Sequence, residues 1–395
     1  MFILYIILAI VILLFMVLIH EFGHYTIGRM LGFKITEFSI GFGKALFSRK
    51  NKRGELISLR IFPLGGYCAF AGEEDTDAQN PDSFTNQKPW KRILVFLAGV
   101  TFNFAAAVIF SMILLCTVGY DIPQVNGFMP FDTQHISNIV EGSEITNVPE
   151  GTGLQEGDII ISIRGEKIDF AYGKTYNEIM KAEISALSEY MAAYKDADNE
   201  TKRLAFQEYP TIPAIVKRGD DYANVELGFY QALVNNQKYD ENGDKVEGEF
   251  VQEYEYFWDV NVTAYVHTFW EAVERAVPFA FGMAWVVLKS LFLLITFQLP
   301  LSAIGGPVTT IATIASFTQT NFANILVLIP LISANLAVFN ALPIPALDGA
   351  HVLFTTIEAV RKKPIKRETE NMIHAIGLFI LFGAVILIDI LHFLL

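Results

Sequence analysis

The stretch MFILYIILAIVILLFMVLIHEFGHYTIGRM, residues 1–30, decides the fold. From Met1 to Ile19 it carries no charged or strongly polar side chain, which matches the roughly 20 residues that a helix needs to cross a bilayer core. A secretory signal peptide fits poorly, because the stretch lacks a basic start and a small-residue cleavage site. The sequence therefore predicts a membrane-spanning helix.

His20, Glu21 and His24 follow at once in the pattern H-E-x-x-H. Residues i and i+4 of a helix lie on one face, so both imidazoles can bind one Zn²⁺ while Glu21 accepts a proton from a bound water. The pattern also arises by chance, so its surroundings must support it. Ionisable groups at membrane depth are costly and usually functional. The pattern therefore favours a zinc hydrolase that works inside the bilayer.

The composition is that of a multi-pass membrane protein with a sizeable soluble part, since 52% of the residues are hydrophobic and the mean hydropathy is +0.38. The net charge of −13 belongs to residues 120–265, which hold 27 acidic and 11 basic residues. Such a surface argues against nucleic acid as a partner. Cys68 and Cys116 are too few and too far apart in the chain for a disulfide framework.

Further apolar stretches complete the membrane part. The predicted spanning helices after the first are residues 93–118, 325–354 and 372–395. Small side chains in residues 93–118 suit close helix packing, and Asn103, the one strongly polar residue there, is interpreted as an interhelical hydrogen bond. Pro343 and Pro345 interrupt the third span.

Charge predicts the topology. Residues 29–92 and 361–367 form basic loops and are expected in the cytosol, with residues 120–265 outside. The chain must then cross an odd number of times between the acidic domain and the last basic loop. Residues 277–298 are therefore interpreted as an interfacial or re-entrant helix, with Lys289 reaching the headgroups. The expected fold is an α-helical multi-pass membrane protein with four transmembrane helices.

Two regions outside the spans are predicted to contain strands. Period-two alternation punctuated by Gly41, Gly43 and Gly54 indicates a small membrane-associated β-hairpin or three-stranded sheet, with a plain connector as the alternative. The segment GLQEGDIIISIRGEKI, residues 153–168, resembles the core of a PDZ domain. Residues 175–208 depart from that plan as a charged, Ala-rich helical insertion.

The chain is thus expected to have three parts. These are a first membrane half (1–119), an extracytoplasmic PDZ-like α+β domain (120–265) and a second membrane half (266–395). PDZ domains bind extended peptides by adding a strand to a sheet edge. No carboxylate-binding loop is recognisable upstream of Asn138, so peptide binding stays open.

A catalytic zinc takes three protein ligands and leaves a position for water. Asp348 is the one acidic residue between Gln298 and Glu358, and its proline-rich approach indicates a broken helix that lines a cavity. The alternative is an aspartate that caps a helix beside Gly349. Asp348 is therefore the candidate third ligand.

The motifs HEFGH, GFGK, PLGGY, KPWKRILVFLAGVTFN, IGGP and NALPIPALDGAH occur in this order along the chain. Together they resemble the site-2 protease family of intramembrane zinc metalloproteases, and most closely its bacterial regulator-of-sigma-factor proteases. The resemblance implies that His20, His24 and Asp348 bind Zn²⁺ and that Glu21 is the catalytic acid/base.

The resemblance also implies a substrate site. Its expected residues are Gly41, Gly43, Gly65 and Gly66 in the hairpin, which would present an edge strand, and Asn340, Pro343 and Pro345. His351 and Asn103 are expected beside the ligands without binding the metal themselves. Val100 stands where the family usually has proline, and Ala350 where it has glycine, which puts local helix packing in doubt.

The implied substrates are single-span membrane proteins such as anti-sigma factors, and signal-peptide remnants, cut in the bacterial cytoplasmic membrane after an upstream site-1 protease. Two alternatives come from other classes. A membrane zinc transporter would need further ligands along a pathway, for which the other spans offer His374 and Asp389. A non-catalytic PDZ-bearing scaffold would have no use for Glu21.

Overall fold

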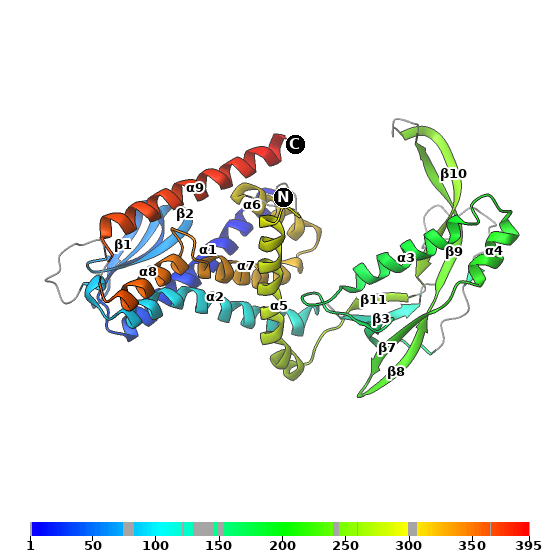
Figure 1. Ribbon diagram of the computed structural model, residues 1–395, viewed down its shortest axis with the longest axis horizontal. Coiled ribbons are helices and arrows are strands. Elements are labelled where there is room, and N and C mark those ends of the chain that lie inside the picture. Colours follow the sequence, from blue (N-terminus) through cyan, green and yellow to red (C-terminus); the bar gives the residue numbers. More distant parts are fainter. Residues whose placement is uncertain are drawn as a thin grey trace. The chain divides into compact units, whose positions relative to one another are not determined.

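The computed structural model describes residues 2–73, 83–120, 122–128, 146–147, 153–239, 245–258, 260–298, 306–363 and 365–394. The chain divides into two units. The membrane unit comprises Met1–Leu114 and Thr268–Leu395, and the inserted unit comprises Leu115–His267. In Figure 1 the inserted unit is drawn mainly in green, and the membrane unit in the colours at the two ends of the bar.

The membrane unit is mainly helical. Its helices are α1 (Phe2–Met30), α2 (Pro89–Thr117), α5 (Phe269–Ile295), α6 (Pro307–Thr320), α7 (Asn324–Ala341), α8 (Asp348–Arg361) and α9 (Arg367–Leu394). Within the described residues, α1, α2, α5, α7 and α9 are long and apolar enough to cross a membrane. The chain is therefore a membrane protein with several long apolar helices. The four-span count is not confirmed, because α5 qualifies by length and composition although the loop charges predict an interfacial helix there.

The predicted third span, residues 325–354, is two helices rather than one. Proline lacks the backbone N–H that a helix needs and restricts the residue before it, so α7 ends before Pro343 and Pro345. Ala346 has a φ of +79°, which an L-residue rarely adopts. At Gly349 a Cβ would lie 2.2 Å from the carbonyl oxygen of Leu342. The resulting tight turn starts α8 at Asp348.

The predicted hairpin is present as β1 (Ile35–Lys50) and β2 (Leu56–Phe70). Both strands curl, so that Phe38 pairs with Ile57 and also with Cys68. The first half of β1 thus lies between two segments of β2. Among the described strands, residues 66–70 pair with the first half of β1 alone. A short 3₁₀ helix, η1 (Phe84–Asn86), follows before α2.

A polar group stabilises the curl of the hairpin. Arg60 Nη2 donates to Glu37 Oε1 over 2.7 Å, and the Ser58 hydroxyl donates to the same oxygen. Burial alone would raise the pKa of Glu37, but these hydrogen bonds outweigh it and lower the pKa overall. Glu37 is therefore expected to stay ionised between the strands.

Within its described residues, the inserted unit contains two antiparallel sheets. One has the order β11-β3-β5-β7-β8, with β6 on β5, and the other has the order β10-β9-β4. The strands are β3 (Pro123–Phe128), β4 (Thr146–Asn147), β5 (Ile159–Ile163), β6 (Glu166–Lys167), β7 (Ile212–Arg218), β8 (Asp221–Leu227), β9 (Phe229–Tyr239), β10 (Lys245–Trp258) and β11 (Val260–Ala264). Helices α3 (Tyr176–Ala192) and α4 (Asn199–Gln207) occupy the predicted helical insertion.

An apolar core joins the helices of the inserted unit to its larger sheet. Leu187 of α3 and Phe206 near the end of α4 are fully buried in one cluster with Ile160 and Ile163 of β5. Beside this core the buried Asp158 carboxylate accepts hydrogen bonds of 2.7 Å from Arg218. Burial opposes ionisation, but the Arg218 hydrogen bonds lower the pKa of Asp158. The PDZ resemblance stays a prediction.

Candidate metal centre

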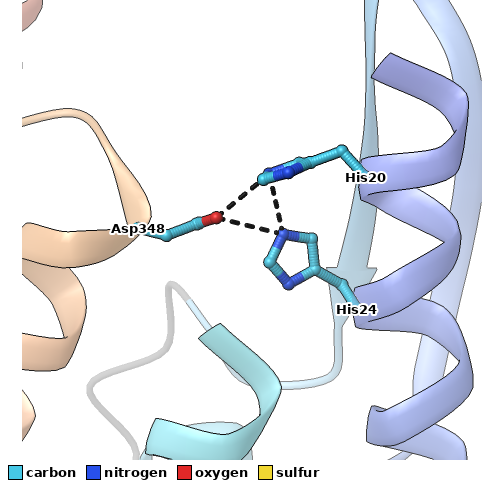
Figure 2. A group of neighbouring side chains, drawn as sticks. All are labelled: His20, His24 and Asp348. Atoms are coloured by element: carbon cyan, nitrogen blue, oxygen red, sulfur yellow. Dashed lines mark hydrogen bonds and ion pairs between the residues drawn. The ribbon is translucent and has the colours of Figure 1, made fainter. Parts of the chain in front are cut away.

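Three side chains from two helices converge in the membrane unit. Figure 2 shows His20 and His24, one turn apart on α1, facing Asp348 at the start of α8. The Asp348 Oδ2 atom lies 3.0 Å from His20 Nε2 and 3.4 Å from His24 Nε2, and the two Nε2 atoms are 3.2 Å apart. The structure thus brings together the three ligands expected from the sequence.

The triangle fits a zinc ion. Tetrahedral zinc with bonds of about 2.0–2.1 Å holds its ligand atoms about 3.3 Å apart, and the three observed distances lie close to that value. Both histidines are 8% exposed. The imidazoles approach Asp348 Oδ2 without hydrogen-bond geometry, so this buried oxygen lacks a hydrogen-bond partner within the described residues. A bound cation would satisfy it.

The outer nitrogens of both imidazoles are held by α2. His24 Nδ1 donates to the Val95 carbonyl oxygen over 2.8 Å, which leaves the Nε2 lone pair for the metal. His20 Nδ1 lies 3.2 Å from the amide nitrogen of Asn103, a fully buried residue whose amide oxygen has no partner within the described residues. Turning the amide lets His20 Nδ1–H donate to that oxygen, which satisfies both groups.

Helix α2 approaches the histidine pair as closely as a glycine allows. A Cβ at Gly99 would lie 2.5 Å from His20 Cε1 and 2.6 Å from His24 Nε2. On the facing helix, a Cβ at Gly23 would lie 2.6 Å from the carbonyl oxygen of Ala98. The sequence indicates general helix packing for the small residues of α2, and it does not single out Gly99 as the residue that makes room for the ligands.

A buried ion pair joins α8 to α2. Arg92 Nη1 donates to Glu358 Oε2 over 2.8 Å, and both side chains are at least nine-tenths buried. The other oxygen, Glu358 Oε1, accepts the backbone N–H of Ile365. This pair fixes α8, whose first residue is Asp348, against α2, the helix whose Val95 and Asn103 contact the two histidines of α1.

A cavity of about 330 Å³ opens beside the ligands. Of the predicted site residues, the cavity is lined by His20, Glu21, His24, Asn103, Asn340, Asp348 and His351. Tyr67, Cys68 and Glu73 also line it, although sequence reasoning gave them no role. The Glu21 carboxylate takes a hydrogen bond from the backbone of Cys68. A carboxylate that is not part of the ligand triangle thus lies in the same cavity.

The other predicted substrate residues lie outside the cavity lining. A Cβ at Gly66 would lie 3.3 Å from Glu21 Cγ, so this residue is beside the carboxylate. Gly41, Gly43 and Gly65 have positive φ angles in the curled hairpin, where they serve the backbone path. Pro343 and Pro345 form the turn before Asp348, and Pro345 packs closely on Gly377 of α9.

Asp389 and His374, the two residues that a transport pathway would need as further ligands, hydrogen-bond to backbone N–H groups. Asp389 accepts the backbone N–H groups of Val308 and Thr309 over 3.1 Å and so caps α6. His374 accepts the backbone N–H of Ala346 over 2.9 Å. The structure therefore gives no support to a chain of zinc ligands through these residues.

Two histidines and a carboxylate around a cavity that contains a further carboxylate are the set of side chains that zinc hydrolases typically use. The model of peptidase family M50 matches residues 8–384. This chain belongs to that family, the site-2 proteases, and is a zinc metalloendopeptidase.

Three relatives carry names that give zinc metalloprotease as their supposed activity. A protein of Campylobacter jejuni is 28% identical over 382 residues, 95% of this chain and 89% of its own. One of Agrobacterium fabrum is 25% identical over 397 residues, 97% and 93% of the two chains. One of Streptococcus pyogenes serotype M1 is 28% identical over 400 residues, 93% of each. The similarity thus runs through both units.

Proposed function

We propose that the protein cleaves the transmembrane segments of single-span membrane proteins, with His20, His24 and Asp348 binding zinc and Glu21 moving the proton. The observation that supports this most directly is the ligand triangle of 3.0–3.4 Å with the Glu21 carboxylate beside it in one cavity. The triangle suits one tetrahedral ion. Within the cavity, Glu21 is close enough to act on a molecule bound next to the ligands.

Zinc held by His20, His24 and Asp348 would supply an activated water and a Lewis acid for the peptide carbonyl. Glu21 would accept a proton from the attacking water and deliver it to the nitrogen of the leaving amine. The Cys68 backbone holds the carboxylate by a hydrogen bond. Val95 and Asn103 contact the outer nitrogens of the two imidazoles and so orient their inner nitrogens towards the metal position.

The β2 segment 66–70 supplies a place for the substrate backbone. A transmembrane helix hides its carbonyl groups and must unwind before attack, which costs several kcal/mol for each unsatisfied backbone group in lipid. A strand that adds to a free sheet edge replaces those hydrogen bonds. Within the described residues, this segment pairs on one side with β1, and its Cys68 backbone reaches Glu21.

The natural substrates in this proposal are anti-sigma-like proteins or signal-peptide remnants, already trimmed by an upstream protease. The acidic unit, Leu115–His267, would lie outside the bacterial cytoplasmic membrane and admit substrates that have lost their outer domain. The charge difference between this unit and the basic loops supports that side. Removing residues 120–265 should then allow cleavage of substrates whose outer domain is intact.

The test uses purified protein in bicelles with a single-span substrate, whose products are sequenced by mass spectrometry. Wild-type protein should cut inside the apolar segment, and Glu21→Gln should lose about 10²–10⁴-fold in rate while keeping about one zinc per chain. Glu274→Gln is the matched control, since it removes an exposed carboxylate of α5 that is not among the residues lining the cavity. Wild-type rates in Glu21→Gln, or cuts confined to the aqueous part of the substrate, would contradict the proposal.

A further inference from the structure

The turn between α7 and α8 is held by a residue of the last helix. The backbone N–H of Ala346 donates to His374 Nδ1 over 2.9 Å. Ala346 is the residue with the left-handed φ of +79°, two positions before Asp348. A non-glycine residue in that conformation persists when its surroundings hold it there. The His374 ring supplies one such contact.

A second contact lies one helical turn further along the same face of α9. A Cβ at Gly377 would lie 2.3 Å from Cβ of Pro345 and 3.2 Å from its carbonyl oxygen. Positions 374 and 377 are three residues apart and so neighbour each other on the helix surface. This face of α9 therefore contacts two consecutive residues of the turn. Gly377 packs against Pro345, and His374 accepts the N–H of Ala346.

Ring stacking fixes His374 in turn. Its ring stacks on His351 of α8, with centroids 4.0 Å apart and an angle of 11° between the planes. His351 stacks on Phe96 of α2, with 4.9 Å between centroids and an angle of 14°. The three rings join α9, α8 and α2, so the acceptor nitrogen of His374 has a defined position relative to the helix that orients both zinc-binding histidines.

His351, Glu370 and His374 also bring their ligand atoms within 4.8 Å of one another, which raises the alternative of a second metal site. An imidazole lone pair lies in the plane of its ring, so the lone pairs of two parallel stacked rings run side by side and do not converge on one ion. His374 Nδ1 is in addition occupied by the Ala346 N–H. The arrangement therefore serves packing and hydrogen bonding.

We propose that His374 is a positioning residue for the zinc ligand Asp348: its Nδ1 holds the Ala346 backbone and so sets where the carboxylate meets the two imidazoles. The inference rests on the proposed ligand set. Displacing the turn would move Asp348 Oδ2 out of a triangle whose sides are 3.0–3.4 Å. Residues that orient a metal ligand typically contribute about 10–100-fold to metal affinity.

The test compares two amides of different reach. In His374→Asn the amide oxygen can occupy the place of Nδ1, whereas in His374→Gln it reaches towards the place of Nε2. His374→Phe keeps a stacked ring without any acceptor. Zinc affinity is measured on the purified full chain by competition with a chelator, and the absorption spectrum of the Co²⁺-substituted protein reports ligand geometry. Thermal unfolding monitors whether each variant is folded.

The Gln and Phe variants should lose about 10–100-fold in zinc affinity and show an altered cobalt spectrum, and Asn should restore most of both. Equal affinity in Gln, Phe and wild type, or an Asn variant as weak as Gln, would overturn the role of His374. Two zinc ions per wild-type chain, with one lost in every His374 variant, would overturn it in favour of a second metal site. A wild-type chain that binds no zinc would instead refute the proposed ligand set itself.

Discussion

Two groups in the membrane unit have the same composition, two histidines and one carboxylate each. In the first group, His20, His24 and Asp348, the imidazole planes meet at 82°, and the two Nε2 atoms lie 3.2 Å apart and 3.0–3.4 Å from Asp348 Oδ2. In the second group, His351, Glu370 and His374, the imidazoles stack at 11°. The two groups thus have the same residue types and similar closeness but differ in the angle between their rings, and this difference favours the first as the metal centre.

The supporting contacts explain this difference. In the first group the outer nitrogens are hydrogen-bonded, His24 to the Val95 carbonyl and His20 to the side chain of Asn103, so the inner nitrogens are left for a metal. In the second group His374 uses a ring nitrogen for the backbone of Ala346. Changes to the contacts of the first group should therefore lower zinc affinity by disturbing a ligand directly. Changes to the second group remove no ligand and should act on zinc only through the position of Asp348.

The largest effect is expected from Gly99→Ala. The added methyl group would lie 2.5–2.6 Å from atoms of both imidazoles, so the histidine pair or α2 must shift. Zinc affinity, measured by chelator competition, should fall by more than the about 10–100-fold that loss of one outer hydrogen bond costs. Gly383→Ala in α9 is the matched control, because no atom of the described residues outside the neighbouring backbone lies within 4 Å of its Cβ position. Equal affinities in both variants would mean that the close approach of α2 has no part in the site.

A smaller loss of zinc affinity is expected when the side-chain amide of Asn103 is removed. Asn103→Leu keeps a similar volume but leaves His20 Nδ1 without its partner, and zinc affinity should fall by about 10–100-fold. Asn103→Asp, which still offers an acceptor oxygen, should bind zinc more tightly than Asn103→Leu. The same competition assay distinguishes them, and a leucine variant with wild-type affinity would show that this contact does not orient the ligand.

The smallest effect is expected from His351→Phe. The substitution keeps a flat ring between Phe96 and His374 and removes two nitrogens that the ligand triangle does not use. Zinc content should stay at about one per chain, with a change in affinity well below the about 10–100-fold expected for a ligand-orienting residue. A loss of zinc as large as that caused by removing a ligand would make His351 part of the metal centre.

The sequence predicts the first group because each of its residues stands out within its own stretch of sequence. H-E-x-x-H places two ligands on one helical face, and Asp348 is the one acidic residue in a long apolar stretch. The contributions of Gly99 and His374 were not predictable in this way, since each acts across helices that are far apart in the chain. The prolines predict an interruption in residues 325–354 but do not reveal that α8 begins at Asp348 itself.

The fold, like the site, was predictable from the sequence in some parts and not in others. Apolar runs predict the long helices α1, α2, α7 and α9, and alternation predicts the curled hairpin. The number of spans depends on α5, whose composition allows crossing while the charges of the flanking loops predict that it lies at the interface. A label on a cysteine introduced at position 300 would decide it, since accessibility from the cytosolic side means that α5 crosses.

The most direct test of the metal centre is the zinc content of three purified proteins: wild type, Asp348→Asn and Glu370→Gln. Each substitution removes one carboxylate charge from one of the two groups and keeps its size. Wild type and Glu370→Gln should contain about one zinc per chain, and Asp348→Asn far less, because two ligands hold the ion more weakly than three. A full complement of zinc in Asp348→Asn, or its loss in Glu370→Gln alone, would contradict the assignment of His20, His24 and Asp348 as the centre.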